Sequence, residues 1–207
     1  MKTIIRCFVI VLQVCLCMAV HTVHAGHLED RLRGYVTIDQ IDDVREMIDN
    51  GANVNWKDAN GSTALIVAAQ HHDNVDMIKL LIEKGADVNA DDKQGETALM
   101  MAAYNGYADI VRMLAEKGAD LNMKNYQGST ALLRACADRP SADVVRVLIE
   151  KGADINIRDN IGQTALGEAM FNANKNEFHY FGRYTADQEK EIAEIIRILR
   201  KAGARAQ

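Results

Sequence analysis

The chain has 207 residues, and its 29 acidic residues outnumber its 24 basic ones, which gives a formal net charge of −5. A single proline, Pro140, sets it apart from proline-rich and low-complexity sequences. No stretch gathers the basic residues that a nucleic-acid-binding surface needs to displace counterions from phosphates, so we expect no nucleic-acid partner.

Residues 1–25 have the pattern of a secretory signal peptide. Lys2 and Arg6 form a positive start, Cys7 to Val20 form an uncharged, mostly apolar run, and Val23-His24-Ala25 supplies a cleavage site with small residues. The alternative is an uncleaved membrane anchor. The run is shorter than the roughly 20 apolar residues of a membrane span, and no stop-transfer charges follow it, so cleavage is favoured.

Export predicts where the protein works and what stabilises it. Cleavage after Ala25 leaves a mature domain over residues 26–207, and the net charge falls to about −7 because two basic residues and no acidic one are lost. Cys136 is then the single cysteine, so no internal disulfide can form and stability must come from packing. We expect a periplasmic monomer, with secretion to the exterior as the alternative and no membrane insertion after cleavage.

Two short phrases recur at a fixed interval through the mature domain. Gly-x-Thr-Ala-Leu recurs with spacings of 34, 33 and 34 residues, beginning at Gly61, Gly95, Gly128 and Gly162. Glu-Lys-Gly-Ala-Asp keeps the same interval, beginning at Glu83, Glu116 and Glu150. Such self-similarity is the signature of a repeat architecture, in which each unit buries its apolar face against its neighbours.

Within a unit, the apolar spacing predicts two short helices and a hairpin-like loop. In the third unit, Leu99 and Ala102 share one face of a first helix, and Ile110 and Leu114 form the stripe of a second. Gly118 follows where a helix needs a left-handed residue to end. We therefore expect an all-α solenoid of five helix–turn–helix units, at about residues 27–57, 58–91, 92–124, 125–158 and 159–204.

These phrases resemble the ankyrin repeat, which combines a glycine, a Thr-Pro-Leu-His segment, a pair of alanines and a later Gly-Ala-Asp turn. The resemblance covers about residues 36–204 and implies a protein-binding module that is not an enzyme. Alanine replaces the family proline in all four phrases, which a helix start tolerates. The family histidine is also replaced, which implies weaker hydrogen bonding between loops; its positions hold Ile66, Met100, Leu133 and Gly167.

The first and last units are atypical, as capping units of a repeat array are expected to be. The first keeps Val44 and Met47 but lacks the Gly-x-Thr-Ala-Leu phrase, so we expect its first helix to be degenerate. In the last unit the Gly-Ala turns at Gly152 and Gly203 lie 51 residues apart, which adds about 17 residues near 171–187, between its two helices. This insertion is either a local cap over the last repeat or a docking element for a partner.

By the resemblance, a partner binds the concave surface that the loop tips and the outer side of the first helices form. Large aromatic residues dominate interface hot spots, so we expect them to contribute most. The alternative for any one of them is a lone exposed ring or one packed on a neighbouring loop. The candidate partner-binding residues are Trp56, His71, Tyr104, Tyr126, Phe171, Phe178, Tyr180, Phe181 and Tyr184. The same surface is expected to include Asn60, Gln70, Lys93, Gln94, Asn105, Gln127, Asp138, Asn160, Ile161 and Asn172.

The residue types that could carry catalysis fit structural roles better. His71-His72-Asp73 has no third ligand at helical spacing, so a solvated helix end is favoured over a metal site. Cys136 takes a tightly packed alanine position, which favours a small core residue over a nucleophile. Arg134 and Glu168 stand at equivalent positions of adjacent units and could pair. No phosphate-binding loop, nucleophile elbow or zinc-protease helix occurs, so we expect no catalytic residue, cofactor or metal.

The function predicted is that of an exported interaction module that binds an unidentified protein through its concave face and aromatic insertion. Short exported ankyrin proteins of bacteria, which this chain is similar to, look like accessory partners of cell-envelope enzymes, including periplasmic catalases. Two alternatives stay open: an immunity or inhibitor protein against an enzyme toxin, and a secreted effector that binds a host protein. An enzyme is the least supported class.

Overall fold

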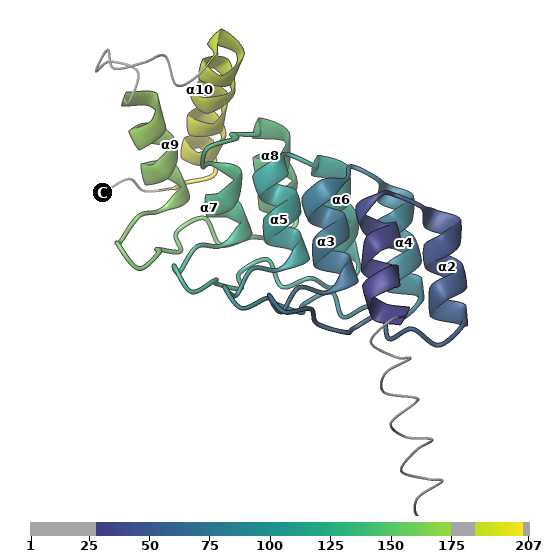
Figure 1. Cartoon of the computed structure of the whole chain (residues 1–207). Helices are drawn as coiled ribbons and strands as arrows, with labels where there is room; N and C mark the ends of the chain where they lie inside the picture. Colours follow the sequence, from purple (N-terminus) through teal and green to yellow (C-terminus); the bar gives the residue numbers. More distant parts are fainter. Residues whose placement is uncertain (1–27, 175–184, 205–207) are drawn as a thin grey trace, which may run out of the picture.

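The computed structural model describes residues 28–174 and 185–204, and over these residues it consists of helices and loops with one isolated β-bridge between Asp91 and Thr97. The predicted all-α solenoid is confirmed (Figure 1). The first helices of the second to fifth units are α3 (Ala64–His71), α5 (Ala98–Asn105), α7 (Ala131–Ala135) and α9 (Ala165–Asn174). The second helices are α2 (Ile41–Asp49), α4 (Val75–Glu83), α6 (Ala108–Glu116), α8 (Ala142–Glu150) and α10 (Ala186–Lys201).

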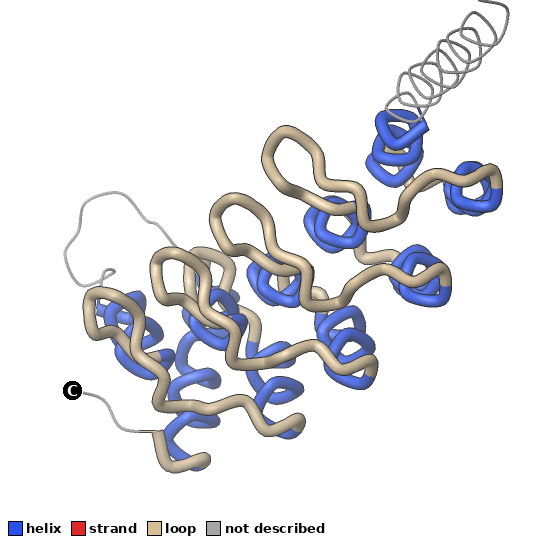
Figure 2. Tube along the Cα trace, turned by 90° about the horizontal axis from the view of Figure 1, so that it is seen from below, coloured by secondary structure: helices blue, strands red, loops and turns tan. Residues whose placement is uncertain are grey.

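The helices form two rows, and the connecting loops project to one side of them. First helices pack on first helices, as α3 on α5 and α5 on α7, while second helices pack on second helices, as α4 on α6 and α6 on α8. Seen along the helix ends, the loops extend past the row of first helices (Figure 2). This is the side that the resemblance to ankyrin repeats predicts to be concave.

The recurring threonine explains why each first helix begins where it does. In α3, α5 and α7 it is the N-cap residue, and its hydroxyl accepts a hydrogen bond from the backbone N–H three residues later. The three residues are Thr63, Thr97 and Thr130. Such a cap satisfies one of the backbone donors that a helix start leaves free, and alanine directly after it favours the helix.

One apolar core runs through all the units. Each central second helix contributes the predicted stripe, and the leucine of that stripe is fully buried: Leu81, Leu114, Leu148 and Leu199. The stripes join because each second helix covers its neighbour and its own first helix. No unit could bury its stripe alone, so stability is shared between neighbours.

The first unit has a better-formed first helix than the sequence suggested. Residues 28–37 are helical, and Leu32 and Val36, four residues apart on one face, are buried in the common core. The segment lacks the Gly-x-Thr-Ala-Leu phrase but keeps an apolar stripe at helical spacing, and tertiary packing is enough to hold it.

Part of the added length of the last unit extends its helices. α9 has 10 residues against 8 in α3 and α5, and α10 has 16 residues against 9 in α8. The extra turns of α10 carry Glu191, whose Oε2 accepts a hydrogen bond from the backbone N–H of Ala142 at 2.8 Å. The extension therefore caps the start of α8 in the preceding unit.

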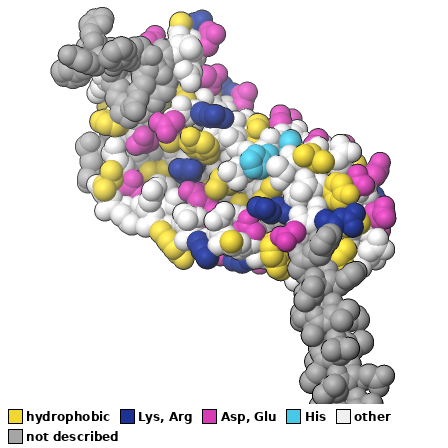
Figure 3. Space-filling view, in the orientation of Figure 1, with side chains coloured by type: hydrophobic (Ala, Val, Ile, Leu, Met, Phe, Trp, Pro, Cys, Tyr) yellow, Lys and Arg dark blue, Asp and Glu magenta, His cyan; other side chains and the backbone are white. Residues whose placement is uncertain are grey.

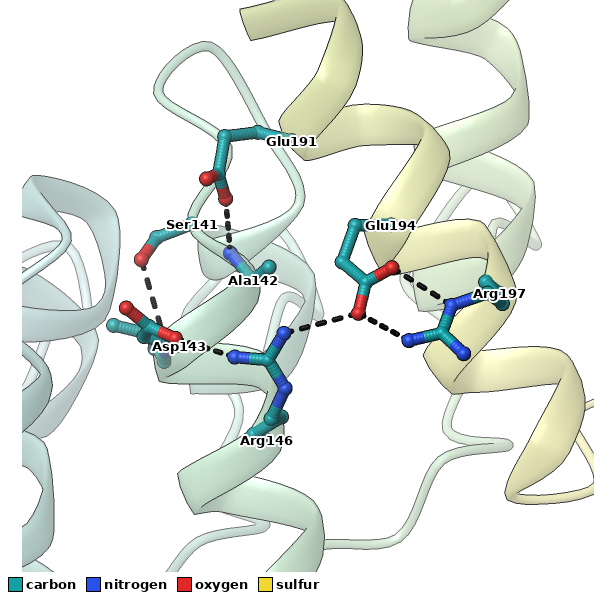
Figure 4. A network of polar contacts seen from close by, with 8 residues as sticks. Ser141, Ala142, Asp143, Arg146, Glu191, Glu194 and Arg197 are labelled. Carbon is teal, nitrogen blue, oxygen red and sulfur yellow. Dashed lines mark hydrogen bonds and ion pairs between the residues drawn. The ribbon is translucent and has the colours of Figure 1, made fainter. Parts of the chain in front are cut away.

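Further along α10, an ion-pair network of four residues, Asp143, Arg146, Glu194 and Arg197, ties the last unit to the one before it (Figure 4). The Glu194 carboxylate accepts from Arg197 on its own helix at 2.7 Å and from Arg146 on α8 at 3.0 Å. Hydrogen bonds from Arg197 and Arg146 lower the pKa of Glu194 from 4.5 to about 2.

We predict that Glu194→Gln lowers stability at neutral pH and that this loss disappears in acid. A carboxylate whose pKa is lower in the folded chain stabilises the fold above its unfolded pKa, and that contribution is lost as the pH falls through the folded value. The difference in free energy of unfolding between the two proteins should therefore be full above about pH 4.5 and shrink towards pH 2. Urea titrations at a series of pH values measure it. Asp187→Asn, on a side chain that is 91% exposed, is the control; an equal pH dependence for both variants would contradict the prediction.

The signal peptide predicted for residues 1–25 stays a prediction, because these residues lie outside the described ones. Among residues 28–174 and 185–204, no helix is long and apolar enough to cross a membrane.

Candidate functional site

The loop tips are built by one repeated turn. A side-chain oxygen three residues before each phrase glycine accepts two backbone N–H groups; in the second loop, Asp92 Oδ1 accepts from Gln94 at 2.8 Å and from Glu96 at 2.9 Å. The same role falls to Asp58, Asn125 and Asp159. Such Asx turns fix a tight bend without help from the rest of the chain.

Adjacent tips are joined by main-chain hydrogen bonds. The Lys93, Tyr126 and Asn160 N–H groups donate to the carbonyls of Asn60, Gln94 and Gln127 at 2.9, 2.9 and 3.0 Å. Replacement of the family histidine predicted weaker hydrogen bonding between loops, yet these bonds have ordinary lengths. The four tips therefore form one rigid rim beside the first helices.

We define the concave face as the eight tip residues together with the exposed side of α3, α5, α7 and α9. The tip residues are the two that precede each phrase glycine: Ala59, Asn60, Lys93, Gln94, Tyr126, Gln127, Asn160 and Ile161. Figure 3 shows the side of the molecule on which the first helices lie, where hydrophobic, uncharged polar and charged side chains are interspersed.

The two rows of helices differ in the charge of their exposed residues. On α4, α6 and α8 every exposed residue is charged: Asp76, Lys79, Glu83, Asp109, Arg112, Glu116, Asp143, Arg146 and Glu150. The exposed residues of α3, α5, α7 and α9 include no Asp, Glu, Lys or Arg; they are Gln70, His71, Phe171 and Asn174. Because charged residues are depleted from the centre of protein interfaces and aromatic ones enriched, this contrast makes the exposed side of α3, α5, α7 and α9 the candidate binding surface.

The aromatic candidates are exposed to different degrees. Tyr126 and Phe171 are 71% and 51% exposed, and neighbouring Ile161 is 84% exposed. His71 is exposed at the end of α3. These side chains can meet a partner without rearrangement.

Trp56 and Tyr104 are half-buried, so they offer a partner less area than expected. Trp56 stands five residues before its phrase glycine and so lies outside the tip; Met123 and Ile157 hold the equivalent positions and are also half-buried. The sequence suggested a place at the tip for Trp56 because the tip and the loop segment that leads to it are both short and polar.

Tyr104 belongs to a cluster that the sequence did not reveal. The Arg134 guanidinium lies 4.6 Å from the centroid of the Tyr104 ring, and that of Arg139 lies 5.9 Å from it. Arg134 forms an ion pair of 3.5 Å with Glu96 of the preceding unit, where the sequence had suggested Glu168 as its partner. Asn125 donates to the same Glu96 Oε1 at 2.8 Å.

Three members of this cluster, Glu96, Asn125 and Arg134, line a hollow of ≈ 510 Å³ on the concave face. The hollow is lined by Asn60, Ser62, Gln70, Asp92, Gln94, Glu96, Met101, Asn125, Tyr126, Gln127 and Arg134. Glu96 is 7% exposed, and its Oε2 has no hydrogen-bond partner among the described residues, nor has Arg134 Nε. One signal in the sequence could have predicted this pair. Glu96 lies one residue after a phrase glycine and Arg134 lies six residues after one, and side chains at those positions face the groove.

Asn172 is not part of the binding surface, contrary to the sequence-based expectation. It is fully buried, and its Nδ2 donates to the Cys136 carbonyl at 2.9 Å. Asn105 has a similar role, because its Nδ2 donates to the Gln70 carbonyl at 3.0 Å. These amides satisfy carbonyls at the end of the preceding first helix, which would otherwise lack donors.

The histidine pair and the cysteine have structural surroundings. A ring nitrogen of His72 lies 2.7 Å from the Thr37 carbonyl, so this histidine connects the second unit to the first. Cys136 is fully buried in the core, and burial raises the pKa of its thiol. In the part of the chain that the structure describes, no group of three or more His, Cys, Asp or Glu residues could hold a metal ion.

Four partner-binding candidates lie outside the described residues, and their role stays a prediction. They are Phe178, Tyr180, Phe181 and Tyr184.

Two family models match the chain. The one described as ankyrin repeats (3 copies) matches residues 36–125, and the one described as ankyrin repeats (many copies) matches residues 114–169. A comparison with curated proteins found no match.

Proposed function

Since the chain belongs to the ankyrin-repeat family of protein-interaction modules, we propose that it is an exported module that binds one protein partner through its concave face. The observation that carries the proposal is the contrast between neighbouring helices of the second to fifth units: exposed residues are all charged on α4, α6 and α8, and none is Asp, Glu, Lys or Arg on α3, α5, α7 and α9. A surface that stays in contact with water tolerates charged side chains. A surface that is buried in a complex contains few of them, because removing an unpaired charge from water is costly.

Two exposed aromatic residues anchor the partner in this proposal. Tyr126 stands on a rim whose backbone is fixed by bonds to both neighbouring tips, and Phe171 projects from α9 at the position equivalent to Tyr104. Rigid, exposed rings lose little conformational freedom on binding, which is why such residues contribute much of an interface's affinity.

The export half of the proposal rests on residues 1–25 and places the partner in the periplasm or outside the cell. The same surface would serve each of three roles: that of an accessory protein for a cell-envelope enzyme, of an inhibitor of an enzyme toxin, or of a protein that binds a host protein. The partner's identity separates them. Recovery from the periplasm with Gly26 as the first residue supports export, and recovery of uncleaved chain from the cytoplasm contradicts it.

We expect the Tyr126→Ala/Phe171→Ala double variant to lose a partner that the unchanged mature chain captures from the envelope fraction. Truncating hot-spot aromatics typically costs about 2 kcal/mol or more each, so retention should fall by well over tenfold. Quantitative mass spectrometry of the captured proteins measures it. Ile38→Ala is the matched control, because Ile38 is 62% exposed but follows the helical segment 28–37, away from the loop tips. Equal capture by the double variant would place the binding surface elsewhere.

A further inference from the structure

Four exposed carboxamide side chains line the hollow of the concave face: Asn60, Gln70, Gln94 and Gln127. Three of them occupy the same tip position, directly before the phrase glycine, in three consecutive units. A repeated array therefore presents the same chemical group three times along one edge of the groove.

These carboxamides differ from the asparagines that the fold itself uses. Asn55 donates through Nδ2 to the Gly85 carbonyl at 2.9 Å and accepts from Asp87 N–H at 2.8 Å. Asn89 repeats the pattern in the next unit. By contrast, the side-chain amides of the three tip carboxamides make no hydrogen bond with any residue from 28 to 174 or 185 to 204.

Each free carboxamide offers one acceptor and two donors, which is the complement of a peptide unit with its C=O and N–H. Two buried atoms at the floor of the hollow also lack hydrogen-bond partners among the described residues. Glu96 Oε2 lacks a donor, and Arg134 Nε lacks an acceptor. Both atoms are buried, and the side chain of Arg134 is 22% exposed, so that side chain would have to turn for the two atoms to meet a ligand. The main chain of a peptide carries the donor and the acceptor that they lack.

The repeat spacing also fits an extended chain in the polyproline II conformation. Packed helices lie about 8–10 Å apart, and this conformation repeats every three residues, over about 9 Å. Every third peptide unit then faces the same edge of the groove, so a segment of about seven residues runs from Asn60 to Gln127. Recognition of this kind takes affinity from the main chain and selectivity from neighbouring side-chain sites.

We propose that this hollow binds an extended, uncharged segment of the partner by hydrogen bonds between its main chain and the carboxamides of Asn60, Gln94 and Gln127. The inference rests on the proposed function and specifies what part of the partner enters the groove. Tyr126, which also lines the hollow, then contacts a side chain of the segment.

The test uses a synthetic peptide with minimal side chains, acetyl-Gly-Ser-Gly-Ser-Gly-Ser-Gly-amide, titrated into the ¹⁵N-labelled mature chain. We expect saturable shifts of the side-chain NH₂ signals of the three tip carboxamides at millimolar peptide. A counterpart that is N-methylated at every peptide bond keeps its carbonyls but has no main-chain N–H, and it should bind at least roughly tenfold more weakly. Equal shifts with both peptides, or no shift with either, would overturn the proposal.

Two variants separate hydrogen bonding from charge. Gln94→Glu/Gln127→Glu keeps size but removes the donors, and should weaken the peptide by roughly tenfold or more. Asn156→Asp, on an exposed loop residue outside the hollow, introduces a charge without effect on binding. If the double variant binds the peptide as before, the carboxamides are not the contact. If the peptide fails while Tyr126→Ala/Phe171→Ala still abolishes partner capture, the proposed function stands and this inference is wrong.

Discussion

Gly128→Ala should be among the most destabilising single-methyl additions in this protein. Gly128 has a φ of 80°, which disfavours any residue with a Cβ. An added Cβ would also lie 2.6 Å from Asn160 Oδ1 and 2.7 Å from Asn160 N, closer than such contacts occur. Because that N–H donates to the Gln127 carbonyl, relieving the overlap separates two adjacent tips. The combined cost of strain and overpacking is about 2–5 kcal/mol.

Gly162→Ala is the matched control for Gly128→Ala. Its φ is 85°, but nothing lies within 4 Å of an added Cβ. It should therefore cost only the backbone strain of about 1–2 kcal/mol. The difference between the two variants, from urea unfolding followed by circular dichroism, measures the contact between loops. Equal destabilisation would show that tip-to-tip packing contributes nothing to stability, and peptide binding to the hollow should then also be unchanged in Gly128→Ala.

Leu114→Ala should cost about 2–5 kcal/mol, because it removes a fully buried side chain and leaves a cavity that packed helices fill poorly. Leu114 lies on α6, which packs on both α4 and α8, so the loss falls on the centre of the array. Folded proteins of this kind have only about 5–15 kcal/mol to lose. In a linear array, weakening the central unit also weakens the coupling between the two halves. We therefore expect a lower and broader unfolding transition.

Two controls accompany Leu114→Ala. Arg112→Ala, on the exposed side of the same helix, should change stability by no more than about 0.5 kcal/mol. Leu199→Ala removes an equally buried side chain, but from the last helix, and should mainly speed amide hydrogen exchange in α9 and α10. If Leu199→Ala broadens the global transition as much as Leu114→Ala, the array unfolds as a single unit and the nearest-neighbour description fails.

The repeated phrases predicted the architecture because each of their residues has one local task. Thr97 caps a helix, Gly128 turns a loop through a left-handed conformation, and Leu99 fills the core, wherever in the array the unit stands. The missing phrase in the first unit led to an expectation of a degenerate helix. That expectation failed because Leu32 and Val36 supply packing that a motif search does not register.

The candidate site was predicted less well, because a groove is made by residues from different units. The sequence suggested Tyr126 and Phe171, which are exposed, but it placed Asn172 on the surface and missed the Glu96–Arg134 pair below Tyr104. The position of a residue within the repeat predicts the direction in which its side chain points. It does not state whether a neighbouring unit covers that side chain, as the end of α7 covers Asn172.

The sequence by itself determined the family, the helix pairs and the direction of the apolar stripes. All of these depend on interactions within about 34 residues, the length of one repeat. Only the tertiary structure decided which polar groups are already satisfied and which remain for a partner. The asparagines at Asn55 and Asn89 are used by the next unit, whereas the tip carboxamides of Asn60, Gln94 and Gln127 are not. That difference arises because hydrogen bonding depends on atoms brought together across units, and no spacing within one unit specifies it.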